Sequence, residues 1–211
     1  MGREQPLRVC TAANEEWGLN FAHDVVAGGQ AIRVLSVVDA CSQECLALDV
    51  ATSFTTRRVM RVLEQVISEC GQPLAIRCDN RPELKSRRFI AWCVERQIDL
   101  RKSTQNEHLE SLQGRLRSEC LAVNWFEDLF DARRKVAAWR INHNEECLHG
   151  GWGYQTPKEF GAQVEQRYGT DGTGGPKDWP LPRSRPRSKP NNFTVSFRGQ
   201  VGTRIRNEEE D

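Results

Sequence analysis

Two carboxylates stand at positions where side chains can converge on a metal ion. Asp79 follows an apolar run that ends at Cys78, and Glu110 lies in a later stretch with helical spacing. Carboxylate oxygens bind Mg²⁺ and Mn²⁺, and two such ions about 3.5–4 Å apart can hold the attacking and leaving oxygens of a phosphodiester exchange. Taken alone, two carboxylates at the ends of elements are more typical of solvated surface positions. The interpretation therefore depends on the surrounding motifs.

Basic residues form two groups that could contact phosphates. The first lies near Glu110, and the second alternates with Ser and Pro further on; the members are Lys102, Arg115 and Arg117, then Arg183, Arg185, Arg187 and Lys189. Arg115 and Arg117 also suit solvated helix positions, and the second group also suits a linker. Net charge is only +1, from 30 basic and 29 acidic residues. Nucleic-acid binding must therefore rest on local patches and not on bulk charge.

Hydrophobic periodicity predicts the elements that position these residues. Strands are predicted at about 19–26, 32–39, 44–50, 74–79 and 98–101, and helices at about 55–69, 84–97, 104–122 and 127–144. Three strands joined by Gly-containing turns precede strands that alternate with helices. This order predicts an α/β fold in which a mixed five-stranded sheet carries helices on both faces.

Several collinear stretches share the residue pattern of one known family. They are Asn14–Phe21, Val37–Glu44, Cys78–Leu84, Gln105–Leu121 and a closing segment that ends in Tyr154-Gln155-Thr156-Pro157-Lys158-Glu159-Phe160. Together they resemble the catalytic core of retroviral-type integrases, and specifically the integrase half of bacterial insertion-sequence transposases. The resemblance implies a ribonuclease H-like fold and a function in DNA integration and recombination.

The resemblance also implies which residues form the active site. In the family, three carboxylates hold two Mg²⁺ (or Mn²⁺) ions. Asp79 matches the second carboxylate and Glu110 the third, so both are the predicted metal ligands, whereas the first position is Asn20. An amide removes a negative charge from a site for two dications. We therefore expect a degenerate copy, a pseudoenzyme with an incomplete catalytic triad.

Two further departures and one alternative concern the same site. The interval between Asp79 and Glu110 is shorter than in the family, which shortens the loop before Gln105. Arg81 replaces a Gly, which predicts a backbone cost at that position and a guanidinium able to pair with Asp79 or Glu110. Asp39 is a possible substitute for the lost carboxylate. If the hairpin turn centres on Gly28–Gly29, Asp39 pairs near Gly18 and lies close to Asn20.

The remaining features suggest an organisation and a setting. Residues 17–162 form the predicted core, 1–16 a leader or linker, and 163–211 an irregular Gly/Pro/Arg-rich tail with a short strand at 193–197. No run is apolar enough to span a bilayer, and no secretory signal is visible, so a cytoplasmic location is expected. Eight cysteines without a Cys-x-x-Cys spacing favour buried, reduced thiols over zinc.

The leading hypothesis is a transposase-derived nucleic-acid-binding protein without catalysis. The first alternative is an active Mg²⁺-dependent strand-transfer transposase that uses Asp79, Glu110 and either Asn20 or Asp39. The second is a structural subunit of a larger nucleoprotein assembly held by the tail. Expected partners are DNA or another nucleic acid, a second copy in a homodimer, and such an assembly.

Overall fold

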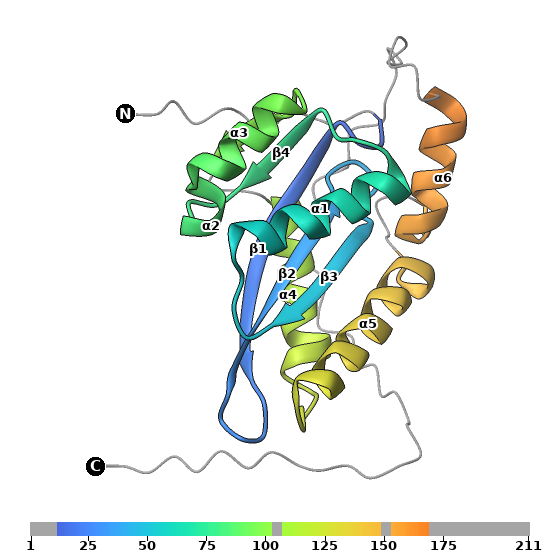
Figure 1. Cartoon of the computed structure of the whole chain (residues 1–211). Coiled ribbons are helices and arrows are strands. Elements are labelled where there is room, and N and C mark those ends of the chain that lie inside the picture. Colours follow the sequence, from blue (N-terminus) through green and yellow to red (C-terminus); the bar gives the residue numbers. More distant parts are fainter. Residues whose placement is uncertain (1–11, 103–106, 149–152, 169–211) are drawn as a thin grey trace.

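The computed structural model describes residues 12–102, 107–148 and 153–168. Within them, five strands form one sheet in the order β3-β2-β1-β4-β5 (Figure 1). Their bounds are β1 Glu16–Val25, β2 Ala31–Asp39, β3 Cys45–Ala51, β4 Ala75–Cys78 and β5 Asp99–Lys102. β1, β2 and β3 pair antiparallel, whereas β1, β4 and β5 run parallel. The predicted mixed five-stranded sheet is confirmed.

Helices cover both faces of the sheet, as predicted. α1 (Thr56–Cys70), α2 (Pro82–Lys85) and α3 (Arg87–Glu95) pack on one face. α4 (Glu107–Arg115), the π-helical segment η1 (Leu116–Leu121) and α5 (Leu129–Glu146) pack on the other, and α6 (Pro157–Tyr168) follows α5. Each face therefore has its own hydrophobic core.

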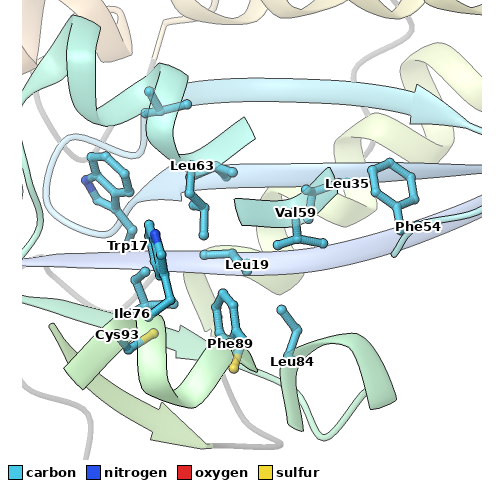
Figure 2. Close-up of a cluster of buried hydrophobic side chains, with 14 of the residues drawn as sticks. Trp17, Leu19, Leu35, Phe54, Val59, Leu63, Ile76, Leu84, Phe89 and Cys93 are labelled. Carbon is cyan, nitrogen blue, oxygen red and sulfur yellow. The ribbon is translucent and has the colours of Figure 1, made fainter. Parts of the chain in front are cut away.

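Strand alternation divides the side chains of β1 between the two cores. Trp17 and Leu19 enter the core beneath α1 and α3 (Figure 2). Phe21 belongs to the same core, whereas Ala22 enters the core beneath α4 and α5. The β1–β2 turn contains Gly29 at φ 75°, a backbone conformation that glycine adopts without steric cost. β1 is thus buried on both sides, which fixes the faces of its polar residues.

The structure differs from the sequence-based boundaries in three places. The predicted helix 84–97 is divided, because Ser86 leaves helical geometry and caps α3 by accepting from the Phe89 N–H at 3.1 Å. The predicted helix 104–122 changes to π-helix after Arg115. α6 was not predicted; a reciprocal hydrogen-bond pair between Thr156 and Glu159 starts it.

The ordered fold also extends past both predicted core boundaries. Asn14, assigned to the leader, donates its backbone N–H to Asp39 at 2.7 Å and its side chain to the Cys70 carbonyl at 2.7 Å. At the other end, α6 passes residue 162 and buries Val164. The predicted strand at 193–197 lies outside the described residues. In the described part of the chain, no helix is long and apolar enough to cross a membrane.

Side chains of α5 cover the outer edge of the sheet at β3. Arg133 donates to the Val50 carbonyl at 2.9 Å, and the amide of Asn144 both accepts from and donates to the backbone of Cys45. An uncovered edge strand would offer unpaired backbone groups to other chains. Here the helix satisfies part of that edge, so β3 is held in place beside the central strands.

Candidate functional site

The structure places Asn20 and Asp79 beside each other on neighbouring parallel strands. Leu19 of β1 pairs with Cys78 at the end of β4, so the next residues along the two strands are Asn20 and Asp79. Neighbouring strands lie about 4.8 Å apart. The two positions predicted to share a metal site are therefore adjacent at the carboxyl end of β4.

The side chain of Asn20 is engaged by its own backbone. Its Oδ1 accepts from the Phe21 backbone N–H at 2.7 Å. Its carbonyl oxygen accepts from the Ser36 hydroxyl at 3.3 Å, across the β1–β2 ladder in which the two residues are paired. The amide oxygen, the atom that would replace a carboxylate oxygen, thus already has a hydrogen-bond donor.

Asp79 is paired with an arginine two residues along the chain. Its Oδ2 lies 3.0 Å from the Nε of Arg81, and its Oδ1 accepts from the Arg81 backbone N–H at 3.2 Å. Of the two predicted partners for Arg81, Asp79 is the one that the structure pairs with it. The predicted backbone cost of Arg81 is wrong, because its φ of −67° and ψ of 148° are ordinary extended values.

Glu110 lies on α4, on the sheet face toward which Asn20 points. The helix is fixed to this face by the buried Leu112 and Leu116, and by a 2.7 Å hydrogen bond from the Gln113 amide to the Ser36 hydroxyl. Ser36 is the ladder partner of Asn20. Glu110 precedes Gln113 by about one helical turn and is exposed. α4 thus keeps the third position on the site's side of the sheet, open to solvent.

Asp39 does not lie where the substitution hypothesis requires it. It pairs with Trp17, one residue before Gly18, and this one-residue difference turns its side chain to the opposite face from Asn20. Its carboxylate is buried and accepts from the backbone N–H groups of Asn14, Cys41 and Ser42 at 2.7–2.9 Å. Burial raises the pKa of Asp39, and these hydrogen bonds oppose the rise. The prediction of Asp39 as a substitute ligand is wrong, because it organises the β2–β3 turn.

The residues present do not fit a site for two dications. The donors at the three family positions are an amide oxygen that already accepts a hydrogen bond, a carboxylate paired with Arg81 and the exposed Glu110. Among the described residues, no group of three or more His, Cys, Asp and Glu side chains could hold a metal ion. Hard dications need several converging oxygen ligands, most of them charged. The local charge instead favours an internal ion pair.

The basic residues predicted to track phosphates have different surroundings. Arg115 pairs with Glu119 at 3.0 Å, whereas Arg117 on η1 and Lys102 at the end of β5 are exposed. Arg117 lies near enough to His23 to contribute to the lowering of its pKa, behind burial, Arg81 and Arg33. The second basic group, Arg183, Arg185, Arg187 and Lys189, lies outside the described residues. Nucleic-acid contact by either group stays a prediction.

The link between α4 and the sheet was not among the sequence-based predictions. Ser36 is fully buried in an otherwise apolar run of β2, and Gln113 is 3% exposed. A single hydroxyl residue in the middle of Val34-Leu35-Ser36-Val37-Val38 was the available signal, because a buried hydroxyl needs a hydrogen-bond partner. The link sets the position of the helix that carries Glu110.

Known sequences match this chain over most of the described core. A family model described as "Integrase core domain" matches residues 11–106, and a second model with the same description matches residues 95–157. The IS407 insertion element uncharacterized 31.7 kDa protein of Burkholderia multivorans is 36% identical over 166 residues, which are 76% of this chain and 60% of that protein. The IS476 insertion element uncharacterized 39.2 kDa protein of Xanthomonas euvesicatoria is 35% identical over 167 residues, 77% of this chain and 48% of that protein. The chain thus spans about half to three fifths of the length of these relatives.

Solved structures match the fold at low sequence identity. The HTLV-2 integrase catalytic core domain in complex with magnesium aligns with a TM-score of 0.57 at 17% identity, over 71% of this chain and 97% of that chain. A chain of the simian T-cell lymphotropic virus intasome in complex with PP2A regulatory subunit B56 gamma aligns with a TM-score of 0.64 at 17% identity, over 90% of this chain and 64% of that chain. These similarities establish a retroviral-integrase-like, ribonuclease H-like fold.

Proposed function

The chain belongs to the integrase core domain family, and from this premise we propose that it is a transposase-derived nucleic-acid-binding protein that has lost strand-transfer catalysis. The family assignment rests on two matching models and two insertion-element relatives. The loss of catalysis is supported by the residues at the predicted metal positions. Nucleic-acid binding is supported by the family and by exposed basic residues.

One observation carries the proposal: Asp79 stands beside the neutral Asn20 in the strand register and pairs with the guanidinium of Arg81. The substitution at Asn20 removes one negative charge, and Arg81 offsets a second. A divalent ion at Asp79 would have to displace a guanidinium at 3.0 Å and would still lack the neighbouring carboxylate. Both differences act in the same direction, against binding of the Mg²⁺ or Mn²⁺ ions that the family uses.

The fold around this site supports a retained binding role. The hydrogen bond between Gln113 and Ser36 and the buried Leu112 and Leu116 hold α4 on the sheet without any metal. None of these contacts involves the side chains of Asn20, Asp79 or Glu110. Lys102 and Arg117 are exposed near this region and are the proposed contacts to DNA or another nucleic acid.

Titration of Mn²⁺ by calorimetry tests the loss of the metal site. We expect no binding by the unmodified protein or by Asn20→Asp alone, and measurable binding by Asn20→Asp/Arg81→Gly, because that pair restores one carboxylate and releases another. Adding Asp79→Ala to the double variant should abolish the binding. Gln65→Glu, which adds an exposed carboxylate on α1, is the control for charge alone.

The active-enzyme alternative predicts the opposite result. It requires Mn²⁺ binding by the unmodified protein that Asp79→Ala removes, together with metal-dependent nicking or joining of DNA. Asp79-dependent Mn²⁺ binding by the unmodified protein, or its metal-dependent nicking or joining of DNA, contradicts the proposed loss of catalysis. The proposed binding role is tested separately, because Lys102→Gln/Arg117→Gln should weaken DNA binding whatever the state of the metal site.

A further inference from the structure

Helices α1 and α3 lie side by side with their N-terminal ends together. At that end the Thr56 hydroxyl lies 3.0 Å from the Ser86 hydroxyl. Further along, Glu64 of α1 accepts from the indole N–H of Trp92 at 3.2 Å and pairs with Arg96 at 3.6 Å. These contacts place the two helices parallel on the face opposite α4 (Figure 1). The exposed side chains in the first turns of α1 and α3 therefore lie on one surface.

That surface is basic and its charges are unpaired. Five exposed side chains from α1, α2 and α3 form what we call the α1–α3 basic surface: Arg57, Arg61, Lys85, Arg87 and Arg88. Within the described part of the chain, none of the five forms an ion pair. By contrast, Arg58 on the same helix α1 pairs with Asp49 of β3. The protein as a whole has a net charge of only +1, so this concentration of charge is local.

The placement of these charges opposes the helix dipoles. Neither α1 nor α3 has an acidic residue in its first turn or a basic residue in its last turn. Instead each has two arginines in its first turn, Arg57-Arg58 in α1 and Arg87-Arg88 in α3, and a glutamate in its last turn. Basic groups at a helix N-terminus are unfavourable, because they meet the positive end of the helix dipole. A local rule broken in the same way on two adjacent helices is typical of a functional surface.

We propose that the α1–α3 basic surface binds the phosphate backbone of nucleic acid without reading its sequence. The proposal rests on the proposed function for the class of ligand, but on none of the residues of the candidate metal site. Arg57 and Arg61 are one helical turn apart, about 6 Å. A duplex presents one negative charge per about 1.7 Å of its axis, so several phosphates lie within reach of the five side chains.

The basic side chains are the proposed ligand-binding groups, and the backbone N–H groups at the starts of α1 and α3 are not. Thr55 caps α1 by accepting from the Arg58 N–H at 3.3 Å, and Ser86 caps α3 by accepting from the Phe89 N–H at 3.1 Å. Long, flexible, exposed side chains suit contacts that follow a backbone of any sequence. The surface continues toward Arg81 through α2, since Arg81 immediately precedes Pro82. Nucleic acid on this surface would therefore reach the edge of the candidate site.

Fluorescence anisotropy with a labelled 30-base-pair duplex of arbitrary sequence, over a range of salt concentrations, tests the proposal. Two variants, Arg57→Gln/Arg61→Gln and Arg87→Gln/Arg88→Gln, each remove two charges. We expect each to raise Kd about 10-fold or more at low salt and to reduce the slope of log K against log[salt] by about 2. A duplex of different sequence should give the same changes, because no base is read.

Matched controls separate this surface from the rest of the protein. Arg134→Gln/Lys158→Gln also removes two exposed positive charges, but both are paired with carboxylates and lie on α5 and α6, so Kd should change less than about 2-fold. Circular dichroism melting shows that each variant is folded.

Two results would overturn the proposal: unchanged Kd and slope in both test variants, or no duplex binding by the unmodified protein. If only Lys102→Gln/Arg117→Gln weakens binding, the proposed nucleic-acid function stands and the α1–α3 basic surface is excluded. If the test variants lose binding while the Mn²⁺ titration shows a working metal site, this surface stands and the loss of catalysis is excluded.

Discussion

The two ends of the β1–β4 strand pair both join an arginine to a carboxylate, with opposite consequences. At the amino end, Glu16 accepts from Arg77 at 2.6 Å and from Arg101 at 2.6 Å, which links β1, β4 and β5. The side chains of Glu16 and Arg77 are 6% and 2% exposed. At the carboxyl end, Asp79 and Arg81 are about one third exposed and belong to a single loop.

The comparison shows where this fold tolerates a change of chemistry. Removal of one partner from a buried ion pair leaves an uncompensated charge, whereas an exposed pair contributes little. Glu16 and its arginines therefore hold three strands together, while Asp79 and Arg81 are free of that task. We therefore expect a change at Asp79, the position predicted to carry catalysis in the family, to leave the sheet folded.

The largest expected effect comes from breaking the buried network. Glu16→Ala leaves the Arg77 guanidinium, which is nearly inaccessible to water, without its partner. We expect a loss of about 3–5 kcal/mol in the free energy of unfolding, measured by urea denaturation. The triple variant Glu16→Ala/Arg77→Met/Arg101→Leu should recover much of that loss, because it removes the charges together. A loss below about 1 kcal/mol for Glu16→Ala would show that the Glu16 network does not hold the three strands together.

The buried His143 should make the free energy of unfolding depend on pH, whereas an exposed group should do so less. Burial, then Arg115, lowers the pKa of His143 to about 4, and its ring stacks on Trp139 at 5.1 Å. In the unfolded chain it titrates near 6.5, so below that pH the unfolded state binds a proton that the folded state refuses. The free energy of unfolding should therefore keep its highest value above pH 6.5, and it should fall by about 3 kcal/mol as the pH approaches 4.

Chemical denaturation at several pH values measures this effect. His143→Phe keeps an aromatic ring against Trp139 and should flatten the profile between pH 4 and 6.5. His23 on β1 is exposed, and burial and nearby arginines lower its pKa as well, so His23→Gln should flatten the profile less than His143→Phe does. An unaltered slope in His143→Phe would assign the pH dependence to other groups.

The smallest expected effect is at the candidate site. Arg81→Gly removes the exposed partner of Asp79 and should change the free energy of unfolding by less than about 1 kcal/mol. Thermal or urea denaturation measures it beside Glu16→Ala. A loss of several kcal/mol would mean that the Asp79–Arg81 pair is structural, and the two ends of the strand pair would then be equivalent.

Much of the fold was predictable from local patterns. The three antiparallel strands, the helix now seen as α1 and the helix now seen as α5 appear close to their predicted positions, because apolar periodicity is a property of neighbouring residues. Boundaries failed where one hydrogen bond decides the conformation, as at Ser86, whose hydroxyl starts α3 and divides a predicted helix. α6 was missed although the spacing of Thr156 and Glu159, which cap its start, is a signal that the sequence already carries.

The sequence predicts which residues stand at the family positions, but not the contacts that their side chains make. The motifs located Asn20, Asp79 and Glu110 along the chain, and the adjacency of Asn20 and Asp79 agrees with the register of β1 and β4. The hydrogen bond that engages the Asn20 amide and the link from Gln113 to Ser36 were not visible, since both depend on which side chains face each other in the folded sheet.

The sequence by itself determined the order of the elements, the family resemblance and the residue at each family position, because these depend only on chain order and residue type. The tertiary structure decided which face Asp39 occupies, which carboxylate Arg81 pairs with, and that the arginines of α1 and α3 share one surface. The physical reason is that side chains alternate along a strand, so a shift of one residue in register reverses the face. Likewise, helices far apart in the chain become neighbours only when both pack on the same core.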